Sequence, residues 1–330
     1  MRITVLGGGS WGTALASHLA GLGHSVSLLV REAAVAEDIN TYSRNSLFLP
    51  ELSLAPGIRA TTEPAAAFEG AEICLLAVPC QYMRETLAGL ASHIPENAVP
   101  ICASKGIEVS SLMRMSQVVD DTLPRQAGNY AVLSGPTFAR EVVKGKPVAI
   151  VLACRNASLG TMLRDVFAGP SLRVYSSTDV VGVETGGAMK NVIAIAAGLS
   201  DGLGLGHNAR AALITRGLAE MSRLGVAFGG RASTFMGLSG MGDLVLTCVG
   251  DLSRNRQVGM RLAAGESMAA IAASMIQVAE GVKTTEAACL LADKHGLDLP
   301  IAAAMRRVIV EGASPRDLAY ELMTRSLREE

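Results

Sequence analysis

One lysine of this chain lies where a charged side chain is costly. Lys190 falls inside VETGGAMKNVIAIAAGLSDGLG, residues 183–204, a run of mostly small and apolar residues. If this run is helical, the positions that share the face of the lysine are all small: Gly186, Gly187, Ala194 and Ala197. The amine could reach water along apolar surface, but two adjacent glycines in a helix favour close backbone approach or a cavity. We therefore expect Lys190 to line a cavity and to exchange a proton there.

Asp243 is a candidate partner for that amine. It lies in GLSGMGDLVLT, a glycine-rich stretch that we expect to form a turn before an apolar run. In such a turn the carboxylate could orient Lys190 or a substrate hydroxyl, or it could bond only to the backbone of the turn. Both interpretations stay open from the residues alone.

A phosphate site is indicated in GDLSRNRQVGMRLAAG. Ser253 is a natural helix N-cap, which places Arg254 in the first helical turn with Asn255 beside it. A cation there opposes the helix dipole, at a cost of tenths of a kcal/mol to about 1 kcal/mol. An arginine together with the free amides at the start of a helix binds phosphate well. The alternative is that Arg254 only faces solvent.

A glycine-rich loop near the N-terminus has the spacing of a dinucleotide site. In ITVLGGGSWGTALA, Gly7, Gly9 and Gly12 follow an expected strand and open an expected helix. Such glycines allow a tight turn and close approach of a pyrophosphate, and the helix start supplies amide donors. A purely structural glycine turn is the alternative, and the strand–turn–helix context argues against it.

Loops at the ends of later strands carry further candidates. In open α/β sheets, ligands bind beyond the carboxyl ends of the strands. Lys105 follows one strand in ICASKGIE, and Gly135 and Thr137 follow the next strand in VLSGPTFARE. Lys105 could clamp an anion, while Gly135 and Thr137 could offer an amide and a hydroxyl. A solvated lysine and an ordinary turn are the alternatives.

The end of the second expected strand bears on cofactor choice. An acidic residue there commonly binds the ribose 2′-hydroxyl of NAD, whereas an arginine accommodates the 2′-phosphate of NADP. This chain has Arg31 followed by Glu32. Arg31 therefore favours NADP, and Glu32 weakens that preference.

The elements that must position these residues change in type along the chain. The first half alternates β-branched runs with helical patterns, which indicates a parallel sheet with helices on both faces. The expected strands are 3–6, 26–30, 73–78, 99–103, 131–133, 148–152 and 172–175, and the helices between them include 11–22 and 83–91. The second half shows only helical periodicity, over 183–199, 208–223, 254–264, 268–275, 284–294 and 300–310, with Gly225, Gly265 and Gly296 as expected helix terminators. We expect two domains, residues 1–180 and 181–330.

Composition argues against several classes of protein. Hydrophobic residues make up 49% of the chain, charged residues 18% and aromatic residues 4%, and the net charge is −1, so a nucleic-acid-binding surface is not expected. The six cysteines form no CxxC pair, which suits buried thiols in a reducing cytosol better than disulfides or zinc. No histidine and carboxylate cluster indicates a catalytic metal. No stretch reaches the roughly 18 apolar residues of a membrane span, so we do not expect an integral membrane protein.

Several segments, in order along nearly the whole chain, resemble the bacterial-type NAD(P)-dependent glycerol-3-phosphate dehydrogenases: GGGSWGTALA, SKGIE, SGPTFARE, ETGGAMKNVIAIAAG, NARAALITRGLAEM, GLSGMGDLVLT, SRNRQVG and AEGVKTT. The resemblance implies an α/β Rossmann-like domain that binds the dinucleotide, followed by an all-α domain that binds the substrate. It implies the reversible reduction of dihydroxyacetone phosphate to sn-glycerol 3-phosphate with NADPH, or alternatively NADH. It also implies cytoplasmic work that supplies glycerophospholipid synthesis, and a homodimer is compatible with it.

The resemblance also implies roles for single residues. Lys190 resembles the catalytic proton donor and acceptor. The residues that resemble the substrate site are Lys105, Gly135, Thr137, Lys190, Asp243, Ser253, Arg254 and Asn255. Those that resemble the cofactor set are Ser10, Trp11, Arg31, Lys105, Ala139, Arg254, Val278 and Glu280, together with Gly7, Gly9 and Gly12 of the loop. Gly8 replaces a commoner alanine, and we expect it to point away from the pyrophosphate.

Two other functions stay in competition. A 6-phosphogluconate- or hydroxyisobutyrate-type dehydrogenase would also join a Rossmann-like domain to helices and use a lysine, but SRNRQVG together with GMGDL argues against it. A non-catalytic protein that senses nucleotides would keep the glycine loop and would need neither Lys190 nor Asp243.

Overall fold

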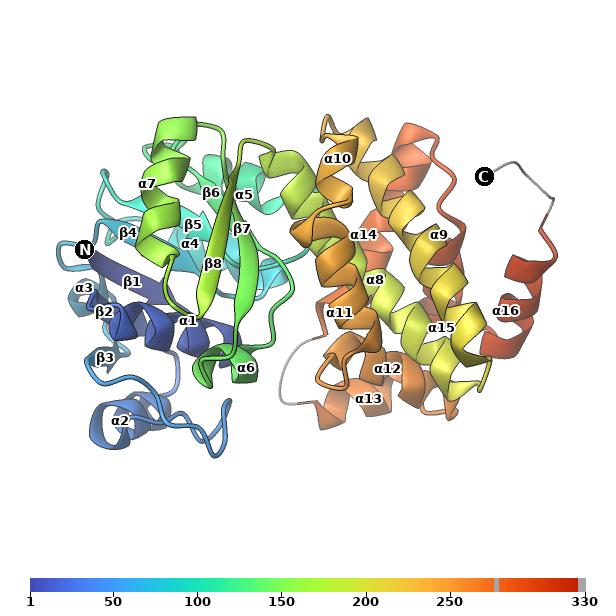
Figure 1. Ribbon diagram of the computed structural model, residues 1–330, viewed down its shortest axis with the longest axis horizontal. Coiled ribbons are helices and arrows are strands. Elements are labelled where there is room, and N and C mark those ends of the chain that lie inside the picture. Colours follow the sequence, from blue (N-terminus) through green and yellow to red (C-terminus); the bar gives the residue numbers. More distant parts are fainter. Residues whose placement is uncertain (276–278, 326–330) are drawn as a thin grey trace. The chain divides into compact units, whose positions relative to one another are not determined.

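The structure, a computed structural model, describes residues 1–275 and 279–325 (Figure 1). The chain divides into two compact units. Unit 1 comprises Met1–Lys105 and Met113–Glu184, and unit 2 comprises Gly106–Leu112 and Thr185–Glu330. Unit 1 is an α/β structure and the regular elements described in unit 2 are helices, which confirms the predicted fold class. The sequence did not indicate that the short segment Gly106–Leu112 belongs to unit 2.

Unit 1 is built on an eight-stranded sheet with the order β3-β2-β1-β4-β5-β6-β7-β8. The strands are β1 (Arg2–Leu6), β2 (Ser25–Leu29), β3 (Ile58–Thr61), β4 (Ile73–Leu76), β5 (Val99–Cys102), β6 (Ala131–Ser134), β7 (Val148–Cys154) and β8 (Leu172–Ser177). Neighbouring strands pair in parallel except β6 and β7, which pair antiparallel. The expected parallel sheet is therefore found in every neighbouring pair except β6 and β7. The connection from β6 contains only the short helix α6 (Ala139–Val143), which suits an antiparallel neighbour.

Helices cover both faces of this sheet. The helices of unit 1 besides α6 are α1 (Ser10–Gly21), α2 (Ala33–Tyr42), α3 (Pro64–Phe68), α4 (Cys80–Leu90), α5 (Met115–Thr122) and α7 (Ala157–Phe167). Along β4, Ile73 and Leu75 belong to one apolar core, whereas Cys74 and Leu76 belong to another. Successive strand residues point to opposite faces, so the two cores lie on opposite sides of the sheet. A strand that is buried on both faces needs apolar residues at successive positions, which explains the continuous hydrophobic run in the sequence.

The strand order reverses at β1, which lies between β2 and β4. In open α/β sheets such a reversal leaves a crevice beyond the carboxyl ends of the two neighbouring strands, and ligands bind there. Gly7, directly after β1, lies against the backbone of Ala77, directly after β4. The glycine loop therefore stands at the place in the sheet where a dinucleotide is expected.

Unit 2 is organised around one long helix, α8 (Val180–Gly202), whose first residues belong to unit 1. Nearly every residue of α8 is buried, as expected of a helix that is apolar on all sides. The other elements are α9 (Gly206–Ala227), α10 (Ala232–Phe235), the π-helical turn η1 (Leu238–Gly242), α11 (Asp243–Val249), α12 (Arg254–Ala263), α13 (Met268–Ser274), α14 (Glu280–His295), α15 (Pro300–Glu311) and α16 (Pro315–Met323).

Two of the three predicted glycine terminators follow helix ends. Gly296 ends α14 in the left-handed conformation with φ 63°, and Gly265, with φ 86°, follows α12. The prediction for Gly225 is wrong, because α9 continues to Ala227. Gly225 instead packs against the ring of Phe235, which would lie 1.9 Å from an added Cβ. This glycine is needed for close packing and does not stop the helix.

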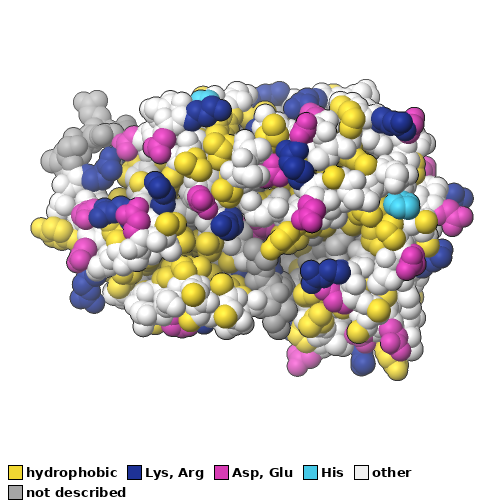
Figure 2. Space-filling model, turned by 180° about the vertical axis from the view of Figure 1, so that it is seen from behind, with side chains coloured by type: hydrophobic (Ala, Val, Ile, Leu, Met, Phe, Trp, Pro, Cys, Tyr) yellow, Lys and Arg dark blue, Asp and Glu magenta, His cyan; other side chains and the backbone are white. Residues whose placement is uncertain are grey.

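Two stretches have the length and composition of a membrane span, Val180–Gly202 and Ala232–Val249, which the sequence analysis did not identify. The first is almost wholly buried inside the protein, as the core helix of a folded domain would be. This is weak evidence for a membrane. On the face shown in Figure 2, positive and negative side chains are interspersed. All six cysteines are free and buried, which confirms the prediction of buried thiols.

Candidate active site

Lys190 is buried in α8 and is paired. Its side chain is 8% exposed, and Nζ donates to Oδ1 of Asp243 at 2.5 Å and to Oγ1 of Thr247 at 2.9 Å. Asp243 is completely buried. A buried charge is tolerated when it is both paired and hydrogen-bonded. Lys190 therefore does not extend along apolar surface to water, and its amine is held at a fixed position by two partners from another helix.

Asp243 and Thr247 both belong to α11. Asp243 is the first residue of this helix, and Thr247 lies one turn later, where its hydroxyl donates to the carbonyl oxygen of Asp243 at 2.6 Å. We expected Asp243 in a turn, but the glycine-rich stretch forms the π-helical turn η1 and leads directly into α11. The sequence analysis missed Thr247 for this reason. The spacing of four residues from Asp243 would have revealed it if α11 had been predicted.

Gly186 accounts for part of the small-residue face of α8. A Cβ at Gly186 would lie 2.7 Å from the carbonyl oxygen of Ser239 in η1. Glycine therefore lets α8 approach the backbone that leads into Asp243. Of the two explanations for the small face, close backbone approach holds at this position.

Next to the lysine, a chain of amide hydrogen bonds joins three helices. Nδ2 of Asn255 donates to Oδ1 of Asn191 at 2.9 Å, and the amide of Gly281 donates to Oδ1 of Asn255 at 3.0 Å. Asn255 is thus engaged on both sides and fixes α8, α12 and α14 to one another. Glu280 is the first residue of α14 and so lies beside this bridge. Val278 lies outside the described residues.

Ser253 caps α12 as predicted, since its Oγ accepts from the amide of Arg256 at 3.2 Å. Arg254 is the first residue of this helix and is exposed. Although the residue reaches the surface, desolvation of its guanidinium lowers the pKa of Arg254, and the nearby carboxylate of Glu280 opposes that shift. Arg256, in the same helical turn, donates from its Nε to Oδ2 of Asp201 at 2.9 Å.

In unit 1 the glycine loop has the shape that a dinucleotide needs. Gly7 has φ 112°, and a Cβ at Gly12 would lie 2.0 Å from the carbonyl oxygen of Gly7. The space above Gly9 is open, with no atom within 4 Å of an added Cβ. No side chain caps the start of α1, and such a helix start binds a pyrophosphate. These residues therefore fit NAD(P).

The residues next to the glycine loop differ in whether they already have a partner within the protein. Nε1 of Trp11 is buried and has no hydrogen-bond partner, so it is a donor that a ligand could use. Oγ of Ser10 donates to the carbonyl oxygen of Phe48 at 2.6 Å. Gly8 faces Val30, the residue after β2, since a Cβ there would lie 2.5 Å from Cγ1 of Val30. That contact is a physical reason for glycine where alanine is commoner.

The structure brings Lys105, Gly135 and Thr137 together. Nζ of Lys105 donates to the carbonyl oxygen of Gly135 at 3.1 Å, and Oγ1 of Thr137 donates to the same oxygen at 3.2 Å. Gly135 has φ 144°, and a Cβ there would lie 2.9 Å from Cα of Ile150. Glycine is therefore required at this position. Ala139 begins α6 shortly afterwards.

Arg31 follows β2 and lies on the surface. Its side chain is 92% exposed, and Nη2 lies 2.6 Å from Oε1 of Glu32. The guanidinium thus bonds to the very residue that weakened the prediction for NADP. An exposed pair of this kind contributes about 0–1 kcal/mol, so a ligand phosphate could displace Glu32.

Comparison with known proteins decides the family. The family model described as NAD-dependent glycerol-3-phosphate dehydrogenase N-terminus matches residues 2–160, and the corresponding C-terminus model matches residues 179–320. The chain belongs to the NAD-dependent glycerol-3-phosphate dehydrogenase family. The resemblance drawn from the sequence motifs is thereby confirmed, and so is NAD(P) as the class of cofactor.

Relatives in this glycerol-3-phosphate dehydrogenase family match the whole chain. A protein of Nitratidesulfovibrio vulgaris (strain DP4) named glycerol-3-phosphate dehydrogenase (NAD(P)+) is 60% identical over all of both chains. The crystal structure of glycerol-3-phosphate dehydrogenase from Coxiella burnetii is 37% identical, with a TM-score of 0.93 over 98% of this chain and 99% of that one. A Dunaliella salina structure matches with 25% identity and a TM-score of 0.89, over 97% of this chain and 60% of that chain.

Proposed function

We propose that this chain reduces dihydroxyacetone phosphate to sn-glycerol 3-phosphate with NAD(P)H, reversibly, and that Lys190 donates and accepts the proton. The reaction class follows from membership of the family. The observation that supports the role of Lys190 is its burial against Asp243 and Thr247. A buried ion pair adds little to stability, so a buried and paired lysine is a candidate for a functional role.

The charge state of this cluster suits the reduction. Asp243 favours the ammonium form of Lys190, which is the proton-donating form. When bound, the nicotinamide supplies the hydride. Nζ of Lys190 polarises the substrate carbonyl and then donates its proton to the carbonyl oxygen, a contribution of about 10²–10⁴-fold to the rate. Thr247 and Asp243 together fix the direction of Nζ. In the oxidation, the lysine must first lose its proton against the attraction of Asp243.

Other residues bind and orient the substrate and the cofactor. We assign the substrate phosphate to Arg254 and the start of α12, where a guanidinium and helix amides converge. We also assign the substrate to Lys105, Gly135 and Thr137 in unit 1 and to Ser253 and Asn255 in unit 2. The proposed cofactor residues are Gly7, Gly9, Ser10, Trp11, Gly12, Arg31, Lys105, Ala139, Arg254, Val278 and Glu280. Unit 1 would then bind the dinucleotide, and unit 2 would supply the proton.

We place the reaction in the cytoplasm, where its product supplies glycerophospholipid synthesis. Buried free thiols suit a reducing compartment. The partners that we propose are the small-molecule substrate and product, with a second copy of the chain in a homodimer. The interspersed charges of Figure 2 do not favour nucleic acid.

NADPH oxidation with dihydroxyacetone phosphate tests this function. The assay should be run beside unphosphorylated dihydroxyacetone and a panel of ketoacids. We expect efficient turnover of dihydroxyacetone phosphate and little of the others. Turnover of a ketoacid instead would favour a different dehydrogenase, and NADPH binding without any turnover would favour a nucleotide sensor.

A further inference from the structure

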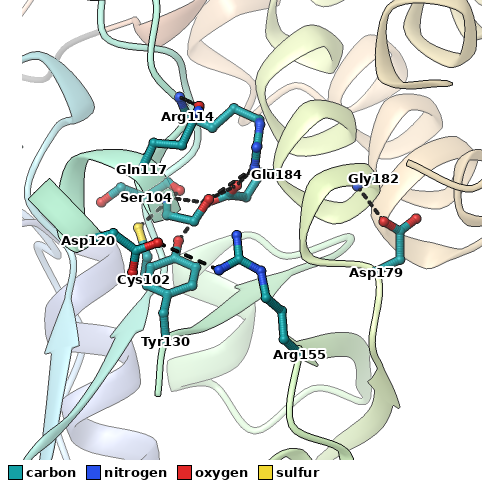
Figure 3. A network of polar contacts seen from close by, with 11 residues as sticks. Cys102, Ser104, Arg114, Gln117, Asp120, Tyr130, Arg155, Asp179, Gly182 and Glu184 are labelled. Atoms are coloured by element: carbon teal, nitrogen blue, oxygen red, sulfur yellow. Dashed lines mark hydrogen bonds and ion pairs between the residues drawn. The ribbon is translucent and has the colours of Figure 1, made fainter. Parts of the chain in front are cut away.

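Glu184 is a buried carboxylate whose bonding positions are all used within unit 1 (Figure 3). Its Oε1 accepts from the amide of Ser116 at 2.6 Å and from the hydroxyl of Tyr130 at 2.7 Å. Its Oε2 accepts from Oγ of Ser116 and from Nη1 of Arg114, both at 2.7 Å. A carboxylate has about four lone-pair sites, and four donors fill them. Glu184 is therefore built into the protein and has no capacity left to bind a ligand.

The energetics of this network make it rigid. The side chains of Arg114 and Glu184 are 12% and 4% exposed, so each would be an uncompensated buried charge without the other. Burial raises the pKa of Tyr130 well above its usual value, and Cys102 and Glu184 add to that shift. The phenol therefore stays protonated and keeps donating to the carboxylate. Fully satisfied buried networks of this kind hold one geometry.

The Glu184 network lies close to the points where the chain passes between the two units. The chain passes between the two units after Lys105, after Leu112 and after Glu184. Arg114 is the N-cap of α5 and comes just after the second of these passages. Glu184 is the last residue before the third. One carboxylate thus ties together two of the chain segments through which unit 1 is connected to unit 2.

Glu184 also belongs to the helix that carries the proton donor. α8 begins in unit 1 and continues into unit 2 without a break. Near its start, Oδ1 of Asp179 accepts from the amide of Gly182 at 2.9 Å (Figure 3). Lys190 follows Glu184 by less than two helical turns. Whatever fixes the first two turns of α8 therefore acts on the element that presents the amine of Lys190.

Resting on the proposed function, we propose that Glu184 is a positioning residue for proton transfer by Lys190, because it anchors the start of α8 to α5 in unit 1. Glu184 does not exchange a proton in the reaction. Its role is to keep the first two turns of α8 from shifting, so that the amine of Lys190 meets the substrate carbonyl in the right place. Misplacement of a catalytic group by about 1 Å can cost on the order of 100-fold in rate.

Glu184→Gln tests the proposal directly. The amide keeps the shape of the side chain but places an NH₂ group against the donors of Arg114 and Ser116. We expect kcat to fall between about 10-fold and about 100-fold, while the Kd for NADPH stays within about 2-fold of wild type. The solvent deuterium isotope effect on kcat should rise, because proton donation by a misplaced lysine limits the rate more.

The matched control is Glu220→Gln. Glu220 is a buried carboxylate of unit 2 that accepts from the amides of Ile301 and Ala302, at the start of α15. We expect this variant to lose stability and to keep kcat and the isotope effect of the wild type. If Glu184→Gln also keeps both while losing stability, the network is merely structural and the proposal is wrong.

A milder variant and one comparison keep the test decisive. If Glu184→Gln does not fold, Tyr130→Phe removes a single donor and keeps the volume. We then expect kcat to fall by about 3-fold with a raised isotope effect, and an unchanged isotope effect would overturn the proposal. Failure of the wild type to turn over dihydroxyacetone phosphate would overturn the proposed function itself. Normal wild-type turnover with an indifferent Glu184→Gln would overturn only the role of Glu184.

Discussion

The two units contribute candidate residues in opposite ways. In unit 1 the loop residues Gly7, Gly9 and Gly12 are suited to a ligand because they lack side chains, and they lie within one turn of the chain. In unit 2 the cluster consists of side chains, with Lys190 on α8 and Asp243 on α11, 53 residues apart. The glycine loop of unit 1 should therefore be broken by adding a methyl group. The cluster of unit 2 should be broken by removing a functional group while the shape of the side chain is kept.

The largest effect is expected from Asp243→Asn. The amide has nearly the shape of the carboxylate but leaves Lys190 buried without its counter-charge, at a cost of about 3–5 kcal/mol in the free energy of unfolding. We expect kcat to fall at least about 100-fold, because the amine is no longer held and oriented. Urea denaturation and steady-state kinetics measure the two losses.

The control for this prediction is Asp251→Asn. Asp251 also pairs with a cation, Arg256, but its side chain is 96% exposed. This variant should resemble the wild type in both measurements. Equal losses of kcat in the two variants would contradict a special role for the charge of Asp243.

The same contrast explains what the sequence could predict. The glycine loop is contiguous, and its strand–turn–helix context is local, so the sequence correctly placed the strand before the loop and the helix after it. Most of the strands were also identified, because a strand buried on both faces is a continuous apolar run. β3 was missed. It is a short edge strand with Arg59 exposed, so its pattern alternates and gives a weak signal. The direction of β7 depends on its neighbour and cannot be read from its own residues.

The cluster in unit 2 could be predicted only in part. The sequence predicts functional roles for Lys190 and Asp243, but it leaves open whether the carboxylate of Asp243 orients Lys190 or a substrate, or bonds only to the backbone. The structure adds Thr247, which the sequence analysis missed because glycines in GLSGMG argue for a turn. One of those glycines is needed for close packing, since a Cβ at Gly240 would lie 2.2 Å from the carbonyl oxygen of Phe235. Propensity was overridden by tertiary contact, as is common at sites of close backbone approach.

Gly12→Ala should break the glycine loop of unit 1. The added Cβ would lie 2.0 Å from the carbonyl oxygen of Gly7, so the loop has to shift. Overpacking of this kind costs about 1–3 kcal/mol, which corresponds to roughly 5- to 150-fold in the Kd for NADPH. Fluorescence titration of NADPH measures it. Gly89→Ala, at an exposed helical glycine with open space around it, is the control and should bind normally. Unchanged affinity in Gly12→Ala would mean that the loop does not bind the cofactor.

Arg254→Leu tests a side chain of unit 2. The loss of a charge-assisted hydrogen bond to phosphate costs roughly 1–3 kcal/mol in kcat/KM for dihydroxyacetone phosphate. Unphosphorylated dihydroxyacetone should be affected much less. Arg261→Leu is the control on the same helix, because Arg261 pairs with Glu266 at the surface. Equal fractional losses on both substrates would show that Arg254 does not bind the phosphate.

The smallest effect is expected at Arg31, an exposed side chain of unit 1 that we expect to bind the 2′-phosphate of NADPH. Arg31→Ala should lower kcat/KM for NADPH roughly 5-fold, which corresponds to about 1 kcal/mol, and leave kcat/KM for NADH unaffected. An exposed guanidinium contributes little and would contact only the 2′-phosphate. Glu32→Gln should act in the opposite direction by releasing the guanidinium. A wild type indifferent to the two cofactors, or a mutant that loses both equally, would defeat the assignment of Arg31.

Lys190→Met is the measurement that tests the central claim most directly. Methionine fills the space of the lysine stem and removes the proton, so the account predicts normal NADPH binding and a kcat at least about 100-fold lower. Lys294→Met, which removes an exposed lysine from the last turn of α14, is the matched control and should keep full activity. Turnover of dihydroxyacetone phosphate by Lys190→Met at a rate close to that of Lys294→Met would contradict the assignment of Lys190 as the proton donor.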